Sequence, residues 1–347
     1  MLLERSGLPE ALLSLAHTNT PLQKVRVEIA GRQQAFWLKL EMHNPTGSIK
    51  FRTALALLDA LHRARPLTTA DVVIESSSGN LGVALADIAD RGGWRFIAVV
   101  DPKTPPELRH RMVQNHAEIV MVDTHDVHGG YLLNRLKTIR GMLRADPALR
   151  WTDQYHNTAA AAVHQSYTAP ELLRQTEGRV DTLFAAVSTG GTLAGVGDGL
   201  REQVPAVQVY AVDVAGSMAV GGTGHPHLLS GIGASRRSVL AGSSHYTDVI
   251  RVTDVEAIAM CRLFRQRTGL GLGASSGAVL AGLVRAVSDG LRPRLPVLIS
   301  PDGEDRYLQT VYADEWLAER GVSAQVRAAE ERAATDGMNF TLCEETS

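Results

Sequence analysis

The hydrophobic and polar residues of this 347-residue chain follow two alternating spacings. Short apolar runs, typical of buried strands, occupy residues 72–74, 96–100, 119–122, 182–187, 207–212 and 296–300. Segments with helical apolar spacing separate most of these runs, among them VALADIAD and the stretch from Leu193 to Leu200. Strands that alternate with helices in this way are typical of parallel sheets covered by helices. The pattern therefore predicts an α/β protein.

After about residue 318 the sequence becomes charged and alanine-rich, and then loses any periodic pattern. We expect a terminal helix followed by a frayed tail. The total length is sufficient for two hydrophobic cores of ordinary size.

The composition narrows the classes of function. A content of 44% apolar and 21% charged residues is that of a soluble globular protein. The net charge is −2 and no basic stripe occurs, so a nucleic acid is not an expected partner. The sequence has no run of 18 apolar residues, so a membrane-spanning helix is not expected. Met1 to Arg5 show no secretory pattern, so export is not expected either. Cys261 and Cys343 lie far apart without ligand-like neighbours, which fits a reducing cytoplasm.

Lys50 follows a Pro-Thr-Gly turn and begins a predicted apolar helix, in the stretch HNPTGSIKFRTALALL. The chain has 30 arginines but only 5 lysines, so a lysine is an uncommon choice of cation here. A guanidinium stays protonated and cannot form a Schiff base, whereas a lysine amine can. The position therefore suggests amine chemistry, with a surface lysine in a first helical turn as the alternative.

A serine-rich loop from Glu75 to Gly82, ESSSGNLG, joins an apolar run to the helix that contains VALADIAD. Free N–H groups and the positive end of the helix dipole favour an anion at such a place. An ordinary N-cap also uses Ser or Asn. Three serines followed by Gly79 and Asn80 exceed what one cap needs, so the loop indicates a site for a carboxylate or a phosphate.

A second loop, STGGT from Ser188 to Thr192, lies between the run 183–187 and the helix from Leu193. Paired glycines let a backbone approach a phosphate closely, and the hydroxyls add donors. The loop lacks the Gly-Lys-Ser/Thr of a P-loop and the glycine spacing of a dinucleotide fingerprint. It therefore indicates another kind of phosphate site, with a structural tight turn as the alternative.

Taken in order, these segments resemble the fold-type II pyridoxal-phosphate enzymes of the cysteine synthase and cystathionine β-synthase family, over about residues 10 to 315. The resemblance implies a tryptophan synthase β-like α/β fold. Two three-layer αβα domains would enclose the cofactor, pyridoxal 5'-phosphate, in a cleft. The larger domain would comprise residues 1–44 and 156–320, the smaller domain 45–155, and a C-terminal helix and tail 321–347. The resemblance also implies a homodimer that acts on small amino acids.

The resemblance assigns a role to each residue that matches a family motif. Lys50 would carry the cofactor as an internal aldimine, Asn80 would contact its ring hydroxyl, and Ser275 its pyridine nitrogen. The phosphate cup would consist of Ser188, Thr189, Gly190, Gly191 and Thr192. The substrate-binding residues would be Ser76, Ser77, Ser78, Gly79, Gln154 and, from a Gly-Ile-Gly-Ala run, Gly231.

Elementary chemistry agrees with these roles. A pyridine nitrogen that faces a serine hydroxyl stays largely unprotonated, so the ring is a weaker electron sink and β-elimination is favoured over transamination. A desolvated Lys50, with a lowered pKa, can remove the Cα proton near neutral pH. The expected reaction is a β-replacement on an activated L-serine through an α-aminoacrylate intermediate.

The segment 123–131 with Asn134 and Arg135 resembles one branch of the family. This branch forms N-(2-amino-2-carboxyethyl)-L-glutamate from O-phospho-L-serine and L-glutamate, for 2,3-diaminopropionate in siderophores and antibiotics. A phosphorylated leaving group carries about −1.5 to −2 charges near pH 7 and favours a guanidinium nearby. Arg135 is our candidate, with a solvated helix face as the alternative. Candidates for binding glutamate are Ser188, Tyr155 and Arg236.

Other chemistries find less support. His125 and His128 are three residues apart, but no third ligand follows at metal spacing, so no metal is expected. Two other functions stay open: a cysteine synthase that uses O-acetyl-L-serine or O-phospho-L-serine with sulfide, and a non-catalytic regulator that binds the cofactor. The intact set of Lys50, Asn80 and Ser275 argues against the regulator.

Overall fold

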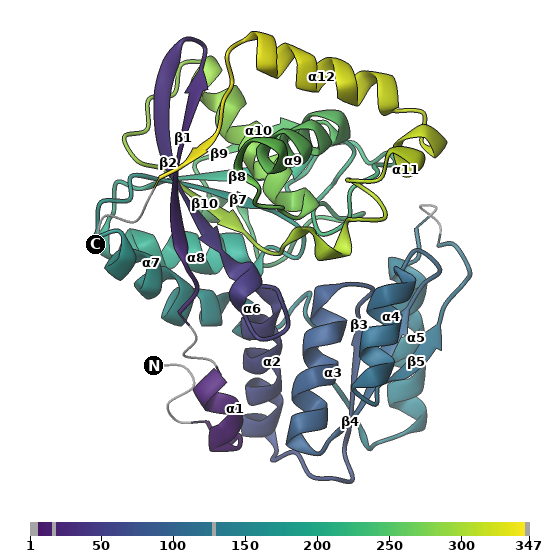
Figure 1. Ribbon diagram of the computed structural model, residues 1–347. Helices are drawn as coiled ribbons and strands as arrows, with labels where there is room; N and C mark the ends of the chain where they lie inside the picture. The colour runs from purple at the N-terminus through teal and green to yellow at the C-terminus, as the bar shows by residue number, and fades with distance from the viewer. Residues whose placement is uncertain (1–5, 16–18, 127–129, 344–347) are drawn as a thin grey trace.

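The computed structural model describes residues 6–15, 19–126 and 130–343, and two β-sheets organise them (Figure 1). The larger sheet has the strand order β11-β1-β2-β10-β7-β8-β9, and the smaller has the order β5-β4-β3-β6. All neighbouring strands are parallel except that β1 runs antiparallel to both β2 and β11. The predicted α/β class is confirmed.

The strands are β1 Leu22–Ile29, β2 Arg32–Leu40, β3 Val72–Ser76, β4 Arg95–Val100, β5 Glu118–Met121, β6 Leu149–Trp151, β7 Thr182–Ala186, β8 Gln208–Val214, β9 Asp248–Val252, β10 Val297–Ser300 and β11 Thr341–Leu342. The α-helices are α1 Glu10–Ser14, α2 Lys50–Ala64, α3 Asn80–Gly92, α4 Pro106–Gln114, α5 Leu132–Ala145, α6 Ala159–Val163, α7 Ala169–Gln175, α8 Gly191–Gln203, α9 Asp254–Thr268, α10 Ala274–Ser288, α11 Asp314–Glu319 and α12 Ser323–Thr335. The short 3-10 helices are η2 Glu41–His43, η4 Ser243–His245 and η5 Glu304–Arg306, and a π-helical turn, η3 His164–Thr168, joins α6 to α7.

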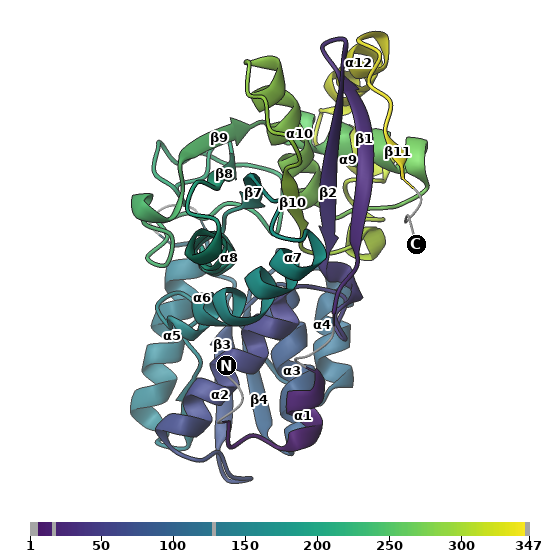
Figure 2. The same ribbon diagram turned by 90° about the vertical axis from the view of Figure 1, so that its left-hand side faces the viewer.

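Successive residues of a strand face opposite layers of helices. In β7, Leu183 belongs to the core that contains α7 and α8, whereas Phe184 belongs to the core that contains α9 and α10. In β4, Phe96 packs in the core of α2 and α3, and Ile97 packs in the core that includes Ile139 of α5. Both sheets are therefore covered on two faces (Figure 2). This is why the central strands read as unbroken apolar runs.

All six apolar runs form strands, namely β3, β4, β5, β7, β8 and β10. Of the remaining strands, β2 also contains an apolar run, at residues 35–38, that was not among the predicted ones. In β1, by contrast, exposed and buried residues alternate, because its antiparallel position leaves one face toward solvent.

The two ends of the chain pack against segments that are distant in the sequence. Leu8 and Leu12 lie in the core of α2 and α3, beside the smaller sheet, although β1 and β2 belong to the larger one. At the other end, the prediction of a frayed tail is wrong as far as residue 343. Thr341 and Leu342 pair with β1, because the buried Phe340 ring anchors this segment against Phe264, with ring centroids 5.2 Å apart.

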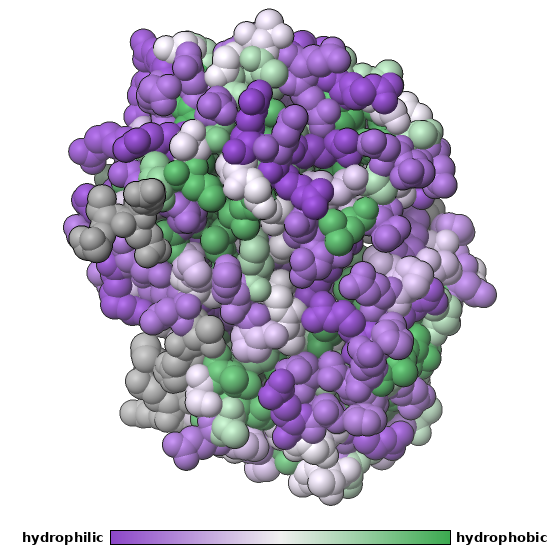
Figure 3. Space-filling view, in the orientation of Figure 1, coloured by the Kyte–Doolittle hydropathy of each residue, from purple (hydrophilic) through white to green (hydrophobic). Residues whose placement is uncertain are grey.

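The surface seen in the orientation of Figure 1 is mostly hydrophilic, with small separate hydrophobic areas (Figure 3). Within the described ranges, no helix combines the length and the apolar character needed to cross a membrane. Cys261 is buried, Cys343 is partly exposed, and both are free thiols.

Candidate active site

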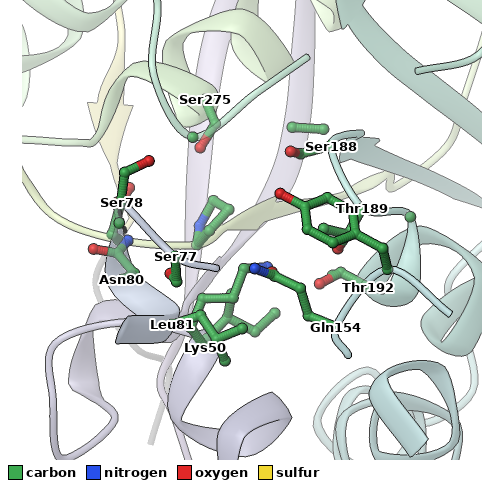
Figure 4. Close-up of a pocket in the computed structure, with 18 of the residues that line it drawn as sticks. Lys50, Ser77, Ser78, Asn80, Leu81, Gln154, Ser188, Thr189, Thr192 and Ser275 are labelled. Carbon is green, nitrogen blue, oxygen red and sulfur yellow. Dashed lines mark hydrogen bonds between the residues drawn. The ribbon is translucent and has the colours of Figure 1, made fainter. Parts of the chain in front are cut away.

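A cavity of about 180 Å³ lies beyond the carboxyl ends of β3, β6, β7 and β10 (Figure 4). Ligand sites in α/β proteins are found at this edge of a parallel sheet. The lining residues are Ile49, Lys50, Ser76, Ser77, Ser78, Gly79, Asn80, Leu81, Arg135, Gln154, Tyr155, Ala186, Ser188, Thr189, Gly190, Thr192, Gly231, Ser275, Ile299, Pro301 and Asp302. Of the site residues expected from the sequence, every one except Gly191 and Arg236 lines this cavity.

Lys50 is the first residue of α2, and its side chain projects into the cavity (Figure 4). The residues before it are tied to the segment after β10, because Ile49 N donates to Pro301 O over 2.9 Å and Ser48 forms a β-bridge with Asp302. Burial lowers the pKa of the Lys50 amine, and the charge of Asp302 opposes that shift. The alternative of an exposed surface lysine is therefore wrong. An amine with a lowered pKa is available as a nucleophile and a base near neutral pH.

The serine-rich loop combines a capping role with a binding surface. The Oγ of Ser77 accepts a hydrogen bond from Gly82 N over 2.9 Å, so one of the three serines serves the helix. Gly79, the N-cap of α3, makes no side-chain cap. Asn80 begins α3, and its Nδ2 donates to Asp302 Oδ2 over 2.7 Å. Figure 4 shows Ser77, Ser78 and Asn80 side by side on one wall of the cavity.

Glu75, directly before this loop, is fully buried beneath it. Its carboxyl accepts hydrogen bonds from Ser76 N, Trp151 Nε1, Thr152 Oγ1 and Gln154 N, over 2.7, 3.3, 2.5 and 3.0 Å. The amide of Gln154 in turn donates to Ser76 O over 2.8 Å. Burial raises the pKa of Glu75 to about 7 despite these donors. The buried carboxyl thus joins the loop after β3 to the loop after β6.

The Ser188–Thr192 loop presents the beginning of α8 to the cavity. Its N-cap, Gly190, has φ +93°, and a Cβ there would lie 2.3 Å from Ser238 Oγ, so glycine is required. No side chain caps α8, which leaves the first backbone N–H groups free for an anion. Gly191 lies outside the lining, and a Cβ there would lie 2.7 Å from Ala160 O. The second glycine therefore permits close packing of α8 against α6.

Ser275 is the second residue of α10, is 1% exposed, and lies on another wall of the cavity from Lys50 (Figure 4). The N-cap of this helix, Gly273, also makes no side-chain cap, and its N–H donates to Asp302 O over 3.0 Å. A single hydroxyl thus faces the cavity at this helix start.

Arg135 does not lie on a solvated helix face, since its side chain is only 8% exposed. Its Nε lies 3.4 Å from Asp101 Oδ2, and in the described part of the chain Nε and Nη1 have no hydrogen-bond acceptor. Nearby, the Arg236 guanidinium stacks over the Tyr155 ring, 4.7 Å from its centroid. The lining of the cavity therefore includes a buried guanidinium that is not saturated by hydrogen-bond acceptors.

The helix that carries Arg135 begins at Leu132, after the Gly130–Tyr131 turn. His128, the second histidine of the segment 123–131, lies outside the described residues. His125 packs against the Tyr131 ring, with centroids 4.4 Å apart.

Three buried groups at or near the cavity were not expected as functional residues: Glu75, His164 and Asp302. Glu75 and Asp302 are acidic residues at the ends of apolar runs, and this position was the available signal in the sequence. His164 lies between Thr53 Oγ1 at 3.2 Å and Thr192 Oγ1 at 3.4 Å from its Nε2. Burial lowers the pKa of His164 well below its usual value, so the ring is neutral. No sequence signal indicated it.

The family model described as pyridoxal-phosphate dependent enzyme matches residues 13–300 of this chain. The N-(2-amino-2-carboxyethyl)-L-glutamate synthase of Ralstonia nicotianae is 39% identical over 86% of the chain and 88% of its own length. The synthase of the same name from Cupriavidus metallidurans is 39% identical over 86% and 89%. The O-acetylserine dependent cystathionine beta-synthase of Helicobacter pylori superposes with a TM-score of 0.77 at 26% identity, over 86% of this chain and 97% of its own.

Proposed function

Because this chain belongs to the family of pyridoxal-phosphate dependent enzymes, we propose that it condenses O-phospho-L-serine with L-glutamate. The products would be N-(2-amino-2-carboxyethyl)-L-glutamate and inorganic phosphate. The observation that carries this proposal is the buried Arg135, whose Nε and Nη1 find no acceptor among the described residues. A phosphorylated leaving group supplies the acceptors that such a guanidinium requires. The two curated relatives with 39% identity bear the name of this activity.

The residues around the cavity fit pyridoxal 5'-phosphate. The uncapped start of α8 offers backbone N–H groups and the hydroxyls of Ser188, Thr189 and Thr192 to a phosphate. The Lys50 amine, whose pKa is lowered, matches an aldehyde, and the Ser275 hydroxyl matches a ring nitrogen. The bound cofactor supplies an electron sink that acidifies the Cα proton of the substrate.

The chain's own residues would perform the remaining steps. The Nζ of Lys50 would take the proton from the substrate Cα and later return it. Ser77, Ser78 and Gln154 would hold the α-carboxylate, with Glu75 fixing Gln154 from below through the 3.0 Å bond to its backbone N–H. A carboxylate held in this way would present Cα to Lys50 and Cβ with its leaving group to Arg135, since both residues line the same cavity.

L-Glutamate, the second substrate, has two carboxylates. The Arg236 guanidinium, the Tyr155 hydroxyl and the Ser188 hydroxyl are the groups we assign to them. The Oγ of Ser188 donates its single proton to Gly233 O over 3.0 Å, so this hydroxyl would have to rotate before it could donate to a bound anion.

The proposal is tested by an absorbance titration of the purified, cofactor-loaded protein. O-phospho-L-serine, O-acetyl-L-serine and L-serine are added separately, followed by L-glutamate or sulfide. We expect only O-phospho-L-serine to change the cofactor spectrum, with phosphate released, and L-glutamate to restore it. If O-acetyl-L-serine changes the spectrum and only sulfide restores it, the protein is a cysteine synthase. A protein that binds the cofactor but responds to no serine derivative would be the non-catalytic regulator.

We also propose the division into a smaller domain, residues 45–155, and a larger domain that contains the seven-stranded sheet. Two separate sheets, each with its own cores, support this division. A homodimer in the cytoplasm is proposed from the family resemblance, and the two free thiols fit a reducing compartment.

A further inference from the structure

Asp302 lies two residues after β10, lines the cavity, and is 2% exposed. Its Oδ2 accepts hydrogen bonds from Asn80 Nδ2 over 2.7 Å and from Tyr307 Oη over 3.0 Å. Its Oδ1 is also buried, yet it has no hydrogen-bond partner within the described ranges. A buried carboxylate oxygen without a hydrogen-bond donor lowers the stability of the fold, so its presence at the cavity calls for an explanation.

The backbone of Asp302 joins three segments of the site. It forms a β-bridge with Ser48, two residues before Lys50. Its carbonyl accepts from Gly273 N over 3.0 Å at the start of α10, and its side chain binds Asn80 at the start of α3. A Cβ at Gly273 would lie 1.9 Å from Asp302 Oδ1, so the contact requires glycine there. Any movement of Asp302 would therefore displace all three segments.

The carboxylate also determines the orientation of the Asn80 amide. An ionised carboxylate only accepts hydrogen bonds, so the NH2 group of Asn80, and not its oxygen, must face Asp302. One N–H of Asn80 is thereby used, and the other is directed by the same contact. The orientation of Asn80 toward a bound cofactor thus depends on the charge of Asp302.

The electrostatic surroundings single out Asp302 as the counter-charge of Lys50. Burial raises the pKa of Asp302, and the charges of Arg306 and Lys50 and the hydrogen bonds from Asn80 and Tyr307 oppose this shift by stabilising the ionised carboxylate. The charged group that acts on Lys50 is Asp302 itself. His164, which also faces Lys50, is neutral and adds no positive charge.

We propose that Asp302 is a positioning residue that orients the Asn80 amide through the 2.7 Å hydrogen bond and provides a negative charge for the protonated Lys50 amine in the same cavity. This inference rests on the proposed function, since it assumes that Lys50 accepts the Cα proton. The proton moves from Cα to Lys50 Nζ and back again, and Asp302 neither gains nor loses one. Its contribution is a fixed negative charge in a buried site, where a lone ammonium would be unfavourable.

The experiment compares the cofactor-loaded enzyme with its Asp302→Asn and Asp305→Asn variants. Asp305 is exposed and lies outside the cavity lining, and its replacement by Asn changes the net charge by the same amount as Asp302→Asn. The readouts are the kcat–pH profile and the isotope effect with α-deuterated O-phospho-L-serine. Without the negative charge the pKa of Lys50 falls, so in Asp302→Asn the acidic limb moves down by about 1 to 3 pH units. The weaker base lowers kcat about tenfold and increases the isotope effect. Asp305→Asn keeps the wild-type profile.

A second variant, Tyr307→Phe, keeps the Asp302 carboxyl group but removes one donor from Oδ2. That donor stabilises the ionised carboxylate, so its loss weakens the counter-charge, and the acidic limb moves down by less than in Asp302→Asn. This variant decides the matter if Asp302→Asn fails to retain the cofactor's visible band. An unchanged acidic limb of the kcat–pH profile in the cofactor-loaded Asp302→Asn and Tyr307→Phe variants, or an upward shift in Tyr307→Phe, overturns the proposal. A wild-type protein that releases no phosphate would instead refute the proposed function.

Discussion

Replacing Arg135 with methionine removes every donor from the guanidinium position and keeps an unbranched apolar side chain. Arg135 lines the cavity, and its Nε and Nη1 have no hydrogen-bond acceptor in the described structure, although Nε lies 3.4 Å from Asp101 Oδ2, so we assign two donors of this guanidinium to a phosphate. A hydrogen bond to a charged group contributes about 1.5–3 kcal/mol. Loss of two such bonds, partly offset by water, should cost about 3 kcal/mol. We therefore expect kcat/KM for O-phospho-L-serine to fall roughly 100-fold, whereas O-acetyl-L-serine, with its uncharged leaving group, should change little.

The assay measures phosphate release and acetate release as a function of donor concentration. Arg140→Met is the matched control, because Arg140 lies on the exposed side of the same helix. The Arg135 change also leaves Asp101 without its ion-pair partner at 3.4 Å, so a double variant with Asp101→Asn separates that effect. Equal losses for both donors, in the single and the double variant, would refute the assignment of Arg135 to the phosphate.

Three further predictions follow from the buried groups. Lys50→Ala should abolish the visible band of the bound cofactor and phosphate release together, with circular dichroism unchanged; surviving activity would contradict the mechanism. Burial raises the pKa of Glu75 from 4.5 to about 7, so its stabilising contribution is full below pH 4.5 and is lost as the pH rises through 7. Because the side chain of Glu75→Gln is neutral at every pH, its free energy of unfolding should rise by about 3 kcal/mol relative to that of the wild type between pH 4.5 and pH 8. Urea unfolding measures this change, and a stability difference that stays constant with pH would contradict the raised pKa of Glu75. Lys39→Met removes a buried ion pair to Glu171 with a 2.5 Å contact and should lower the free energy of unfolding by about 3 kcal/mol. The exposed Lys24→Met should cost almost nothing, and equal effects would show that the Lys39 pair adds no stability.

Local sequence was sufficient for the central strands and for much of the candidate site. A parallel strand buried on both faces must be apolar throughout, so β3, β4, β7, β8 and β10 are visible as short runs. The loops that follow β3 and β7 present backbone and hydroxyl groups to a ligand, and their glycines and serines are contiguous in the chain. Lys50, too, is marked by its place in one short motif.

The structure was needed wherever a property depends on neighbours that are distant in the sequence. The edge strand β11 forms because Phe340 packs against Phe264 across the core, which no local pattern of the tail shows. Arg135 is a typical surface residue by composition, and only the packing of α5 beside Asp101 places it in the cavity.

The same reason applies to the acidic residues of the site. Glu75 and Asp302 are separated by more than two hundred positions, and each takes its character from burial and from donors in other segments. The sequence by itself determined which groups could bind a cofactor and an amino acid. The tertiary structure decided which of them are buried, how their charges are balanced and which atoms remain open to a ligand, because desolvation and electrostatic coupling depend on distance in space.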